Sequence, residues 1–223
     1  MQTELFQKAN TGSKETKVHE LGNAVITEYI CAFTEKESQK LLKALLDEVP
    51  WRHDSIWIAG KNRQIPRLQC WMADPGTNYS YSGLKLTPTA WSKKVLEIRS
   101  RVESLTTRSF NSVLLNYYRN GMDSMAWHAD DEKELGENPV ISSVSFGAER
   151  CLQFKSKLAS DNRRLKLIQH NGSIFLMDHN VQNNWLHQIA KEKKLIMPRI
   201  NLTFRYVYSV SYTHLTLPTK RIV

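Results

Sequence analysis

The hydrophobic pattern near the start of the chain predicts an amphipathic helix. Thr34 and Glu37 stand three positions apart, which is the capping-box pattern of a helix N-terminus. Apolar residues then recur at helical spacing from Leu41 to Val49, and Pro50 ends the pattern. These apolar residues are expected to belong to the core.

A second apolar stripe predicts another helix about forty residues later. The Thr87-Pro88 pair before it fits an N-cap followed by proline at the first helical position. We expect the apolar face of this helix to pack against a sheet. The stripe consists of Trp91, Val95, Ile98, Val102 and Leu105.

Short segments of strand character follow the second helix, separated by Gly, Asn and Pro. They predict an α+β fold with a double-stranded β-helix (jelly roll) core, on whose sheet the N-terminal helices pack. Residues 51–83 show no clear period. The expected strands are 112–118, 124–129, 140–146, 150–155, 164–169, 172–177, 185–190 and 199–208.

One domain is expected over residues 21–208, because 223 residues suffice for one good core. A polar, loose segment is expected over residues 1–20. Residues 209–223 break the strand pattern and resemble translated adapter sequence, so we interpret them as a non-native tail.

The cysteines and the hydropathy both bear on where the protein works. Cys31, Cys70 and Cys151 are odd in number and widely spaced, which argues against a disulfide framework and for a reducing compartment. No apolar stretch is long enough to cross a membrane. We therefore expect a monomer in the cytoplasm or nucleus, without membrane contact.

The charge of the chain favours a polyanionic partner. The formal net charge is +9, and basic residues interleave with aromatic ones between residues 51 and 83. Such interleaving suits nucleic acid, where phosphates pair with cations and bases stack on rings. The alternative interpretation is an ordinary solvated surface over a buried aromatic cluster.

The pair His128-x-Asp130 is a candidate metal-binding element. Residues i and i+2 of a strand point to the same face, so an imidazole and a carboxylate can reach one ion. One more histidine would complete a 2-His-1-carboxylate facial triad, which binds Fe(II) with open positions. The candidates are His170, His179 and His187; of these, His187 lies in a predicted strand and His179 in a predicted turn.

The last predicted strand alternates apolar and polar residues. Its polar face consists of Arg199, Asn201, Thr203 and Arg205. Two guanidinium groups beside an iron would suit a dicarboxylate, since arginine binds carboxylates in a fixed fork. The alternative interpretation is the solvated face of an edge strand.

Taken together, these motifs resemble the AlkB-type Fe(II)- and 2-oxoglutarate-dependent dioxygenases, over roughly residues 24–208. Further matching segments are Pro66-Arg67, Tyr79 to Gly83, Asn116 to Tyr118, Asp130 to Glu132 and Ser143 to Ala148. The resemblance implies an enzyme with Fe(II) on His128, Asp130 and His187, and with 2-oxoglutarate and O2 as cosubstrates. It also implies oxidative demethylation of 1-methyladenine and 3-methylcytosine in DNA, with release of formaldehyde, succinate and CO2.

The resemblance further implies roles for the polar residues around the iron. Arg199 and Tyr118 would hold the distal carboxylate of 2-oxoglutarate. Arg205 and Asn116 would lie near its chelating end. Asn201 and Thr203 would line the pocket.

For the nucleic acid, the resemblance implies a flipped base stacked on Tyr81 and contacted by Tyr79 and Asp131, with Glu132 ordering the region. The charge of Asp131 would favour cationic lesions over uncharged ones. The candidates for contact with the nucleic-acid backbone are Lys61, Arg67 and Arg150.

One departure from the family pattern leaves the strand preference open. Where duplex-preferring relatives carry an aromatic finger, this chain has Ile58-Ala59 before Gly60-Lys61. Ile58 or Trp57 could act as the wedge. Two hypotheses compete with DNA demethylation. One is the same chemistry on RNA or on a protein side chain, and the other is a jelly roll that binds nucleic acid without turnover.

Overall fold

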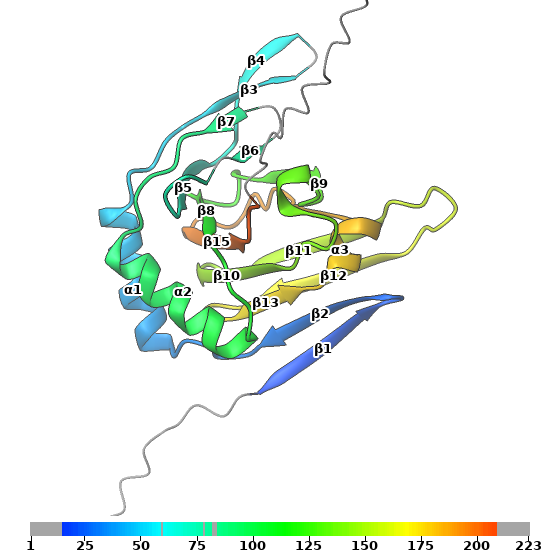
Figure 1. The fold of residues 1–223 in the computed structure, drawn as a ribbon, viewed down its shortest axis with the longest axis horizontal. Helices are drawn as coiled ribbons and strands as arrows, with labels where there is room; N and C mark the ends of the chain where they lie inside the picture. Colours follow the sequence, from blue (N-terminus) through cyan, green and yellow to red (C-terminus); the bar gives the residue numbers. More distant parts are fainter. Residues whose placement is uncertain (1–14, 59, 78, 82–83, 209–223) are drawn as a thin grey trace, which may run out of the picture.

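The computed structural model describes residues 15–58, 60–77, 79–81 and 84–208 (Figure 1). The expected tail at 209–223 lies outside these residues, as does most of the segment expected to be loose at 1–20. Residues 16–20 correct that expectation, because they belong to a strand paired with the next one. The elements are β1 (Thr16–Leu21), β2 (Ala24–Tyr29), α1 (Glu35–Glu48), β3 (Ser55–Ile58), β4 (Lys61–Gln64), β5 (Leu68–Ala73), β6 (Tyr79–Tyr81), β7 (Leu84–Leu86), α2 (Lys93–Thr106), β8 (Ser112–Tyr118), β9 (Met125–His128), the 3-10 helix η1 (Lys133–Leu135), β10 (Ile141–Gly147), β11 (Arg150–Ser156), β12 (Arg164–Gln169), β13 (Ile174–Met177), α3 (His179–Asn184), β14 (Trp185–Ile189) and β15 (Arg199–Arg205).

Two antiparallel sheets face each other and form the jelly roll. The larger has the order β1-β2-β13-β10-β15-β8-β5, and the smaller has the order β12-β11-β14-β9. The strands β8 to β15 are divided between the sheets, four in each, and they correspond to the eight short strands predicted after the second helix. The predicted fold class is therefore confirmed, with strand ends that differ by a few residues.

The two faces of β15 show how the layers are built. Ile200, Leu202 and Phe204 are fully buried on the side of the helices, in an apolar cluster with residues of α1 and α2. The polar residues of β15 point the other way, into the space between the sheets. A second apolar cluster, which includes Phe154 and Trp185, fills the rest of that space. The large sheet thus separates an apolar layer from the layer that holds the polar pocket.

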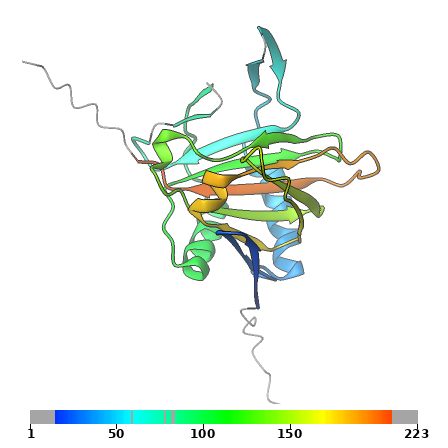
Figure 2. The same cartoon turned by 90° about the vertical axis from the view of Figure 1, so that its right-hand side faces the viewer.

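Both predicted helices lie against the large sheet (Figure 2). The capping box of α1 is present, with Thr34 and Glu37 bonded to each other's backbone. The predicted start of α2 is wrong, because its N-cap is Ser92 rather than Thr87. The chain before it stays extended, since the Thr89 N–H donates to the carbonyl of Trp71 at 2.8 Å.

The segment at 51–83, which shows no period, contains four strands, β3 to β6. β5 pairs with β8 at the edge of the large sheet and is buried on both faces, so its sequence does not alternate. β3 and β4 form a separate hairpin that projects from the body of the molecule (Figures 1 and 2). All four side chains of β4 are exposed, which leaves no apolar pattern to detect.

The described part of the chain contains neither a membrane-spanning helix nor a disulfide bond. No helix there is long and apolar enough to cross a membrane. Cys31, Cys70 and Cys151 are all free thiols.

Candidate active site

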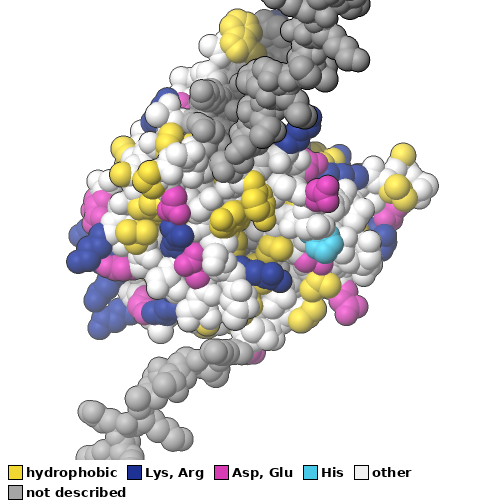
Figure 3. All heavy atoms as spheres, in the orientation of Figure 1, with side chains coloured by type: hydrophobic (Ala, Val, Ile, Leu, Met, Phe, Trp, Pro, Cys, Tyr) yellow, Lys and Arg dark blue, Asp and Glu magenta, His cyan; other side chains and the backbone are white. Residues whose placement is uncertain are grey.

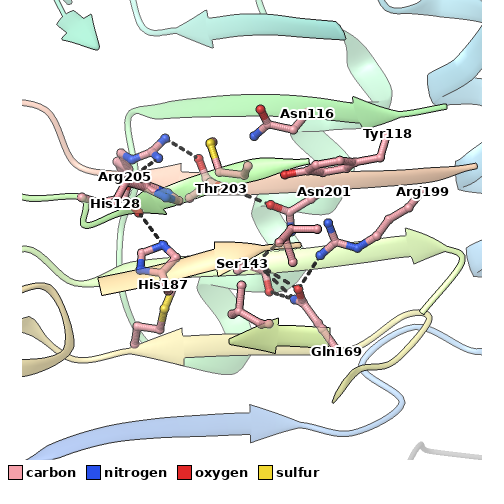
Figure 4. Close-up of a pocket in the computed structure, with 15 residues that line it drawn as sticks. Asn116, Tyr118, His128, Ser143, Gln169, His187, Arg199, Asn201, Thr203 and Arg205 are labelled. Carbon is pink, nitrogen blue, oxygen red and sulfur yellow. Dashed lines mark hydrogen bonds and ion pairs between the residues drawn. The ribbon is translucent and has the colours of Figure 1, made fainter. Parts of the chain in front are cut away.

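Two neighbouring strands of the small sheet bring two histidines face to face. His128 ends β9 and lies directly opposite His187 of β14 in the antiparallel register. Their ring centroids are 4.2 Å apart. Side chains at opposed positions share a face of the sheet, and here that face points between the two sheets (Figure 4). The register therefore positions two imidazoles at one point.

Asp130 adds a carboxylate to this pair from just beyond the end of β9. Its side chain is 1% exposed, and its Oδ2 lies 3.9 Å from Nε2 of His187. Arg205 of β15 donates from Nη2 to Oδ1 of Asp130, and the Asp130 N–H donates to Oε1 of Gln182 at 2.9 Å. The carboxylate is thus fixed from the opposite sheet and from α3. The ligand atoms of His128, Asp130 and His187 all lie within 4.8 Å of one another.

Electrostatics keep this trio in the protonation states that bind metal. Burial, together with the neighbouring His128, lowers the pKa of His187 to about 3. Burial likewise lowers the pKa of His128. For Asp130, burial alone would raise the pKa, but the charge of Arg205 reverses this and lowers it. At neutral pH the site therefore presents two neutral imidazoles and one carboxylate.

The donor atoms fit a metal ion of the Fe(II) type. The Nδ1 atom of His128 lies 2.9 Å from the carbonyl oxygen of Ala126, so in the tautomer with the proton on Nδ1 the lone pair of Nε2 is the one that can bind a metal. Nδ1 of His187 is buried and has no hydrogen-bond partner among the described residues. Two nitrogens and one oxygen on one side are the donor set of a facial triad.

A buried arginine closes the pocket that opens from the trio. Arg199 donates from Nε to the hydroxyl of Ser145 at 2.9 Å and from Nη2 to Oε1 of Gln169 at 2.7 Å. Its Nη1 is buried and has no hydrogen-bond partner among the described residues. Burial lowers the pKa of Arg199 to about 10, so the group stays charged at neutral pH. An unpartnered, charged nitrogen at the end of a pocket is suited to a carboxylate.

The polar residues predicted around the cosubstrate line this same pocket. Asn116 and Tyr118 of β8 lie in register with Asn201 and Arg199, and the Tyr118 ring stacks under the guanidinium at 5.2 Å. Thr203 donates to the side-chain oxygen of Asn201 at 3.1 Å. The pocket is lined by Asn116, Tyr118, Met125, His128, Asp130, Ser143, Leu152, Gln169, Met177, His187, Ile189, Arg199, Asn201, Thr203 and Arg205 (Figure 4).

The residues predicted to contact nucleic acid lie on several different elements. Tyr79 and Tyr81 form β6, but their side chains lie outside the described part of the structure. Lys61 is exposed at the start of β4, and Asp131 is exposed beside the metal-binding trio. Glu132 is the N-cap residue of η1. On the face shown in Figure 3, cationic and acidic side chains are interspersed.

Two of the predicted backbone contacts are corrected by their burial. Arg67 is 3% exposed and donates to Asn116 at 2.7 Å, so it supports the pocket from within. Arg150 is 1% exposed and donates to the carbonyls of Asp123 and Ala190. Both guanidinium groups are bonded inside the protein, which leaves them poorly placed to reach a phosphate on the surface.

The two other candidate histidines lie away from the trio. His170 is half exposed and its Nδ1 lies 2.9 Å from a carboxylate oxygen of Glu149. His179 is the first residue of α3, where the sequence predicted a turn. Neither lines the pocket.

Two buried glutamines are functional candidates that the sequence analysis missed. Gln169 accepts from Arg199 and donates to the Ser143 carbonyl at 2.8 Å, and Gln182 holds the backbone of Asp130. Gln169 could have been found from the sequence. It lies two positions after Leu167 and four after Leu165 in β12, so its polar side chain is on the same inward face as these leucines. Gln182 lies in a short helix without such a pattern.

Comparison with known proteins agrees with this geometry. A family model described as the 2OG-Fe(II) oxygenase superfamily matches residues 22–205. The DNA oxidative demethylase ALKBH2 of Homo sapiens is 35% identical over 188 residues, covering 80% of this chain and 72% of the relative. The human alpha-ketoglutarate-dependent dioxygenase alkB homolog 3 is 35% identical over 181 residues, covering 78% of this chain and 63% of the relative.

A solved structure supports the fold alone. "The structure of OsALKBH1" superimposes with a TM-score of 0.58 at 13% identity, covering 85% of this chain and all of that one. The matched family model, the relatives and the trio between two jelly-roll sheets agree. The chain belongs to the 2OG-Fe(II) oxygenase superfamily, in its AlkB-type branch.

Proposed function

We propose that this protein demethylates N-alkylated bases in DNA, with 1-methyladenine and 3-methylcytosine as substrates. The net reaction oxidises the methyl carbon, which leaves as formaldehyde, while 2-oxoglutarate and O2 become succinate and CO2. One observation carries the proposal: a His-Asp-His trio opens into a pocket that ends at a buried, incompletely bonded arginine. Relatives named as DNA oxidative demethylases support the choice of substrate.

The chain's own residues would divide the work as follows. His128, Asp130 and His187 hold the metal, and Fe(II) supplies the activation of O2 when it is bound. Arg205 keeps Asp130 ionised and oriented. Asp130 and His187 are buried between the sheets, which limits the access of water to their side of the site.

Arg199 would orient the cosubstrate. Its Nη1, which has no hydrogen-bond partner among the described residues, is available to the distal carboxylate, and Tyr118 lies against the guanidinium. Asn116, Asn201 and Thr203 line the remaining wall. A dicarboxylate held at its far end places its other end toward the trio, which is the orientation that chelation needs.

The methylated base has to leave its stack to reach this site. We propose that Tyr81 stacks on the flipped base and that Tyr79 and Asp131 contact it, on the strength of the resemblance and of Asp131's position next to Asp130. Lys61, exposed on the β3–β4 hairpin, remains the candidate for a phosphate contact.

Formaldehyde release from methylated oligonucleotides tests the proposal directly. Iron-loaded protein is incubated with 2-oxoglutarate and matched methylated DNA or RNA, and formaldehyde, succinate and the restored base are measured. His128→Ala, Asp130→Ala and His187→Ala should each abolish turnover while circular dichroism stays unchanged. His179→Ala is the matched control and should keep activity.

Three outcomes would contradict parts of the proposal. Loss of activity in His179→Ala with activity retained in His187→Ala would show a different third ligand. Faster turnover of the methylated RNA would move the substrate class to RNA. Nucleic-acid binding without iron-dependent succinate would show a binding protein and not an enzyme.

A further inference from the structure

Lys157 is held unusually firmly for a lysine near the surface. Its Nζ lies 2.7 Å from Oδ2 of Asp131 and 2.7 Å from the carbonyl oxygen of Gln182. Its own backbone N–H donates to the carbonyl of Asn184 at 2.8 Å. Because its side chain is only 28% exposed, the ammonium has a defined position beside the metal-binding segment.

The partner of this ammonium is the residue that follows a metal ligand. Asp130 points inward at 1% exposure, and Asp131 points outward at 53%. In the proposed function, the Asp131 carboxylate meets the methylated base. An isolated carboxylate there would favour a cationic base by simple Coulomb attraction. An ammonium at 2.7 Å offsets much of that negative charge.

We propose that Lys157 determines substrate specificity by neutralising Asp131, so that the site accepts uncharged methylated bases alongside cationic ones. This inference rests on the proposed function and, within it, on the contact of Asp131 with the base. It reverses the sequence-based expectation that Asp131 makes uncharged lesions poor substrates. The pair is partly exposed, so a change of about two- to fivefold is expected when it is broken.

The test compares two nearly isosteric lesions, cationic 3-methylcytosine and neutral 3-methylthymine, in the same single-stranded DNA. Lys157→Met keeps most of the side-chain length and removes the charge. It should raise the ratio of kcat/KM for 3-methylcytosine over 3-methylthymine by about two- to fivefold. Lys155→Met is the matched control, because its ammonium lies over the Trp127 ring at 4.7 Å instead. It should leave the ratio unchanged.

A double-mutant cycle assigns the effect to the pair. In an Asp131→Asn background, Lys157→Met should no longer alter the ratio. The same ratio measured in Kd, with Mn(II)-loaded protein under anaerobic conditions, should shift in parallel, which separates base recognition from turnover. An equal shift of the ratio in both backgrounds would overturn the inference.

A second contrary result would be equal loss on both lesions with a smaller salt dependence of binding. That pattern would make Lys157 a phosphate contact. Failure of the proposed function has its own signature, since the wild type would then release formaldehyde from neither oligonucleotide.

Discussion

Arg199 illustrates at the scale of one residue how the pocket is prepared for a ligand. The guanidinium is fixed by Ser145 and Gln169, and its Nη1 has no hydrogen-bond partner in the part of the chain that the structure describes. Removing one partner of a buried ion pair costs about 3–5 kcal/mol. Arg199→Ala should therefore raise the apparent KM for 2-oxoglutarate by at least about two orders of magnitude.

The measurement is succinate formation against 2-oxoglutarate concentration in that variant. Arg164→Ala serves as the control, since Arg164 is exposed on β12 and should leave the constant unchanged. If Arg199→Ala keeps the wild-type dependence on 2-oxoglutarate concentration, another residue must bind the distal carboxylate.

Gln182 acts on the metal site through the backbone of Asp130. Its side chain is fully buried, and its Oε1 accepts the Asp130 N–H. Losing an outer-shell partner of a metal ligand typically costs 10–100-fold in affinity, so Gln182→Met should weaken Co(II) binding by roughly that factor.

Titration calorimetry with Co(II) measures this affinity without turnover. Gln188→Met is the matched control, because Gln188 bonds to Gln153 and not to the metal-binding segment. Equal affinities in the two variants would mean that the trio holds its geometry without Gln182.

At the scale of elements, the β3–β4 hairpin offers the clearest surface for a single strand. Trp57 is 75% exposed on it, with Arg63 and Lys61 exposed on the paired strand. Stacking of one base contributes about 1–3 kcal/mol, so Trp57→Ala should raise the KM for methylated single strands about tenfold or more.

Steady-state kinetics on matched single and double strands check this role. Leu158→Ala, which removes another exposed apolar residue from a hairpin, should change neither KM. A loss confined to duplex substrates would identify Trp57 as a wedge instead.

The elements also show which parts of the fold the sequence could predict. Strands with one polar and one apolar face, such as β15, were found from their alternation. β5 escaped because both its faces are buried, and β4 because both are exposed. The start of α2 was misplaced because the hydrogen bond of Thr89 to Trp71 outweighs the local preference of a Thr-Pro pair.

The site was predictable to the extent that it lies on strands. His128, His187 and Arg199 were assigned from the resemblance, and the register places them around one pocket. The burial of Arg67 and Arg150 was not predictable, since composition gives charge but not depth. Distant contacts such as that of Gln182 with Asp130 depend on the full topology.

At the scale of the whole molecule, buried His187 and partly buried His128 make stability depend on pH. The pKa of His187 is about 3 when folded and about 6.5 when unfolded, so between these values the unfolded state binds more protons. Stability should therefore fall as pH decreases through this window, by roughly 1.4 kcal/mol per pH unit for this one group. His128, whose pKa is also lowered, acts in the same direction.

Urea unfolding between pH 4.5 and 7.5 measures this effect on metal-free protein. His187→Asn should show a shallower dependence than the wild type, by about the contribution of one proton. Parallel curves for wild type and His187→Asn would refute the assignment.

The incomplete hydrogen bonding of Arg199 among the described residues also bears on the stability and abundance of the protein in a cell. In the proposed function a dicarboxylate pairs with this buried cation, so it would bind the native state and not the unfolded chain. By mass action, ligand at a hundred times its dissociation constant adds about 2.7 kcal/mol to stability. Supply of 2-oxoglutarate would then set how much enzyme survives quality control, as well as how fast each molecule turns over.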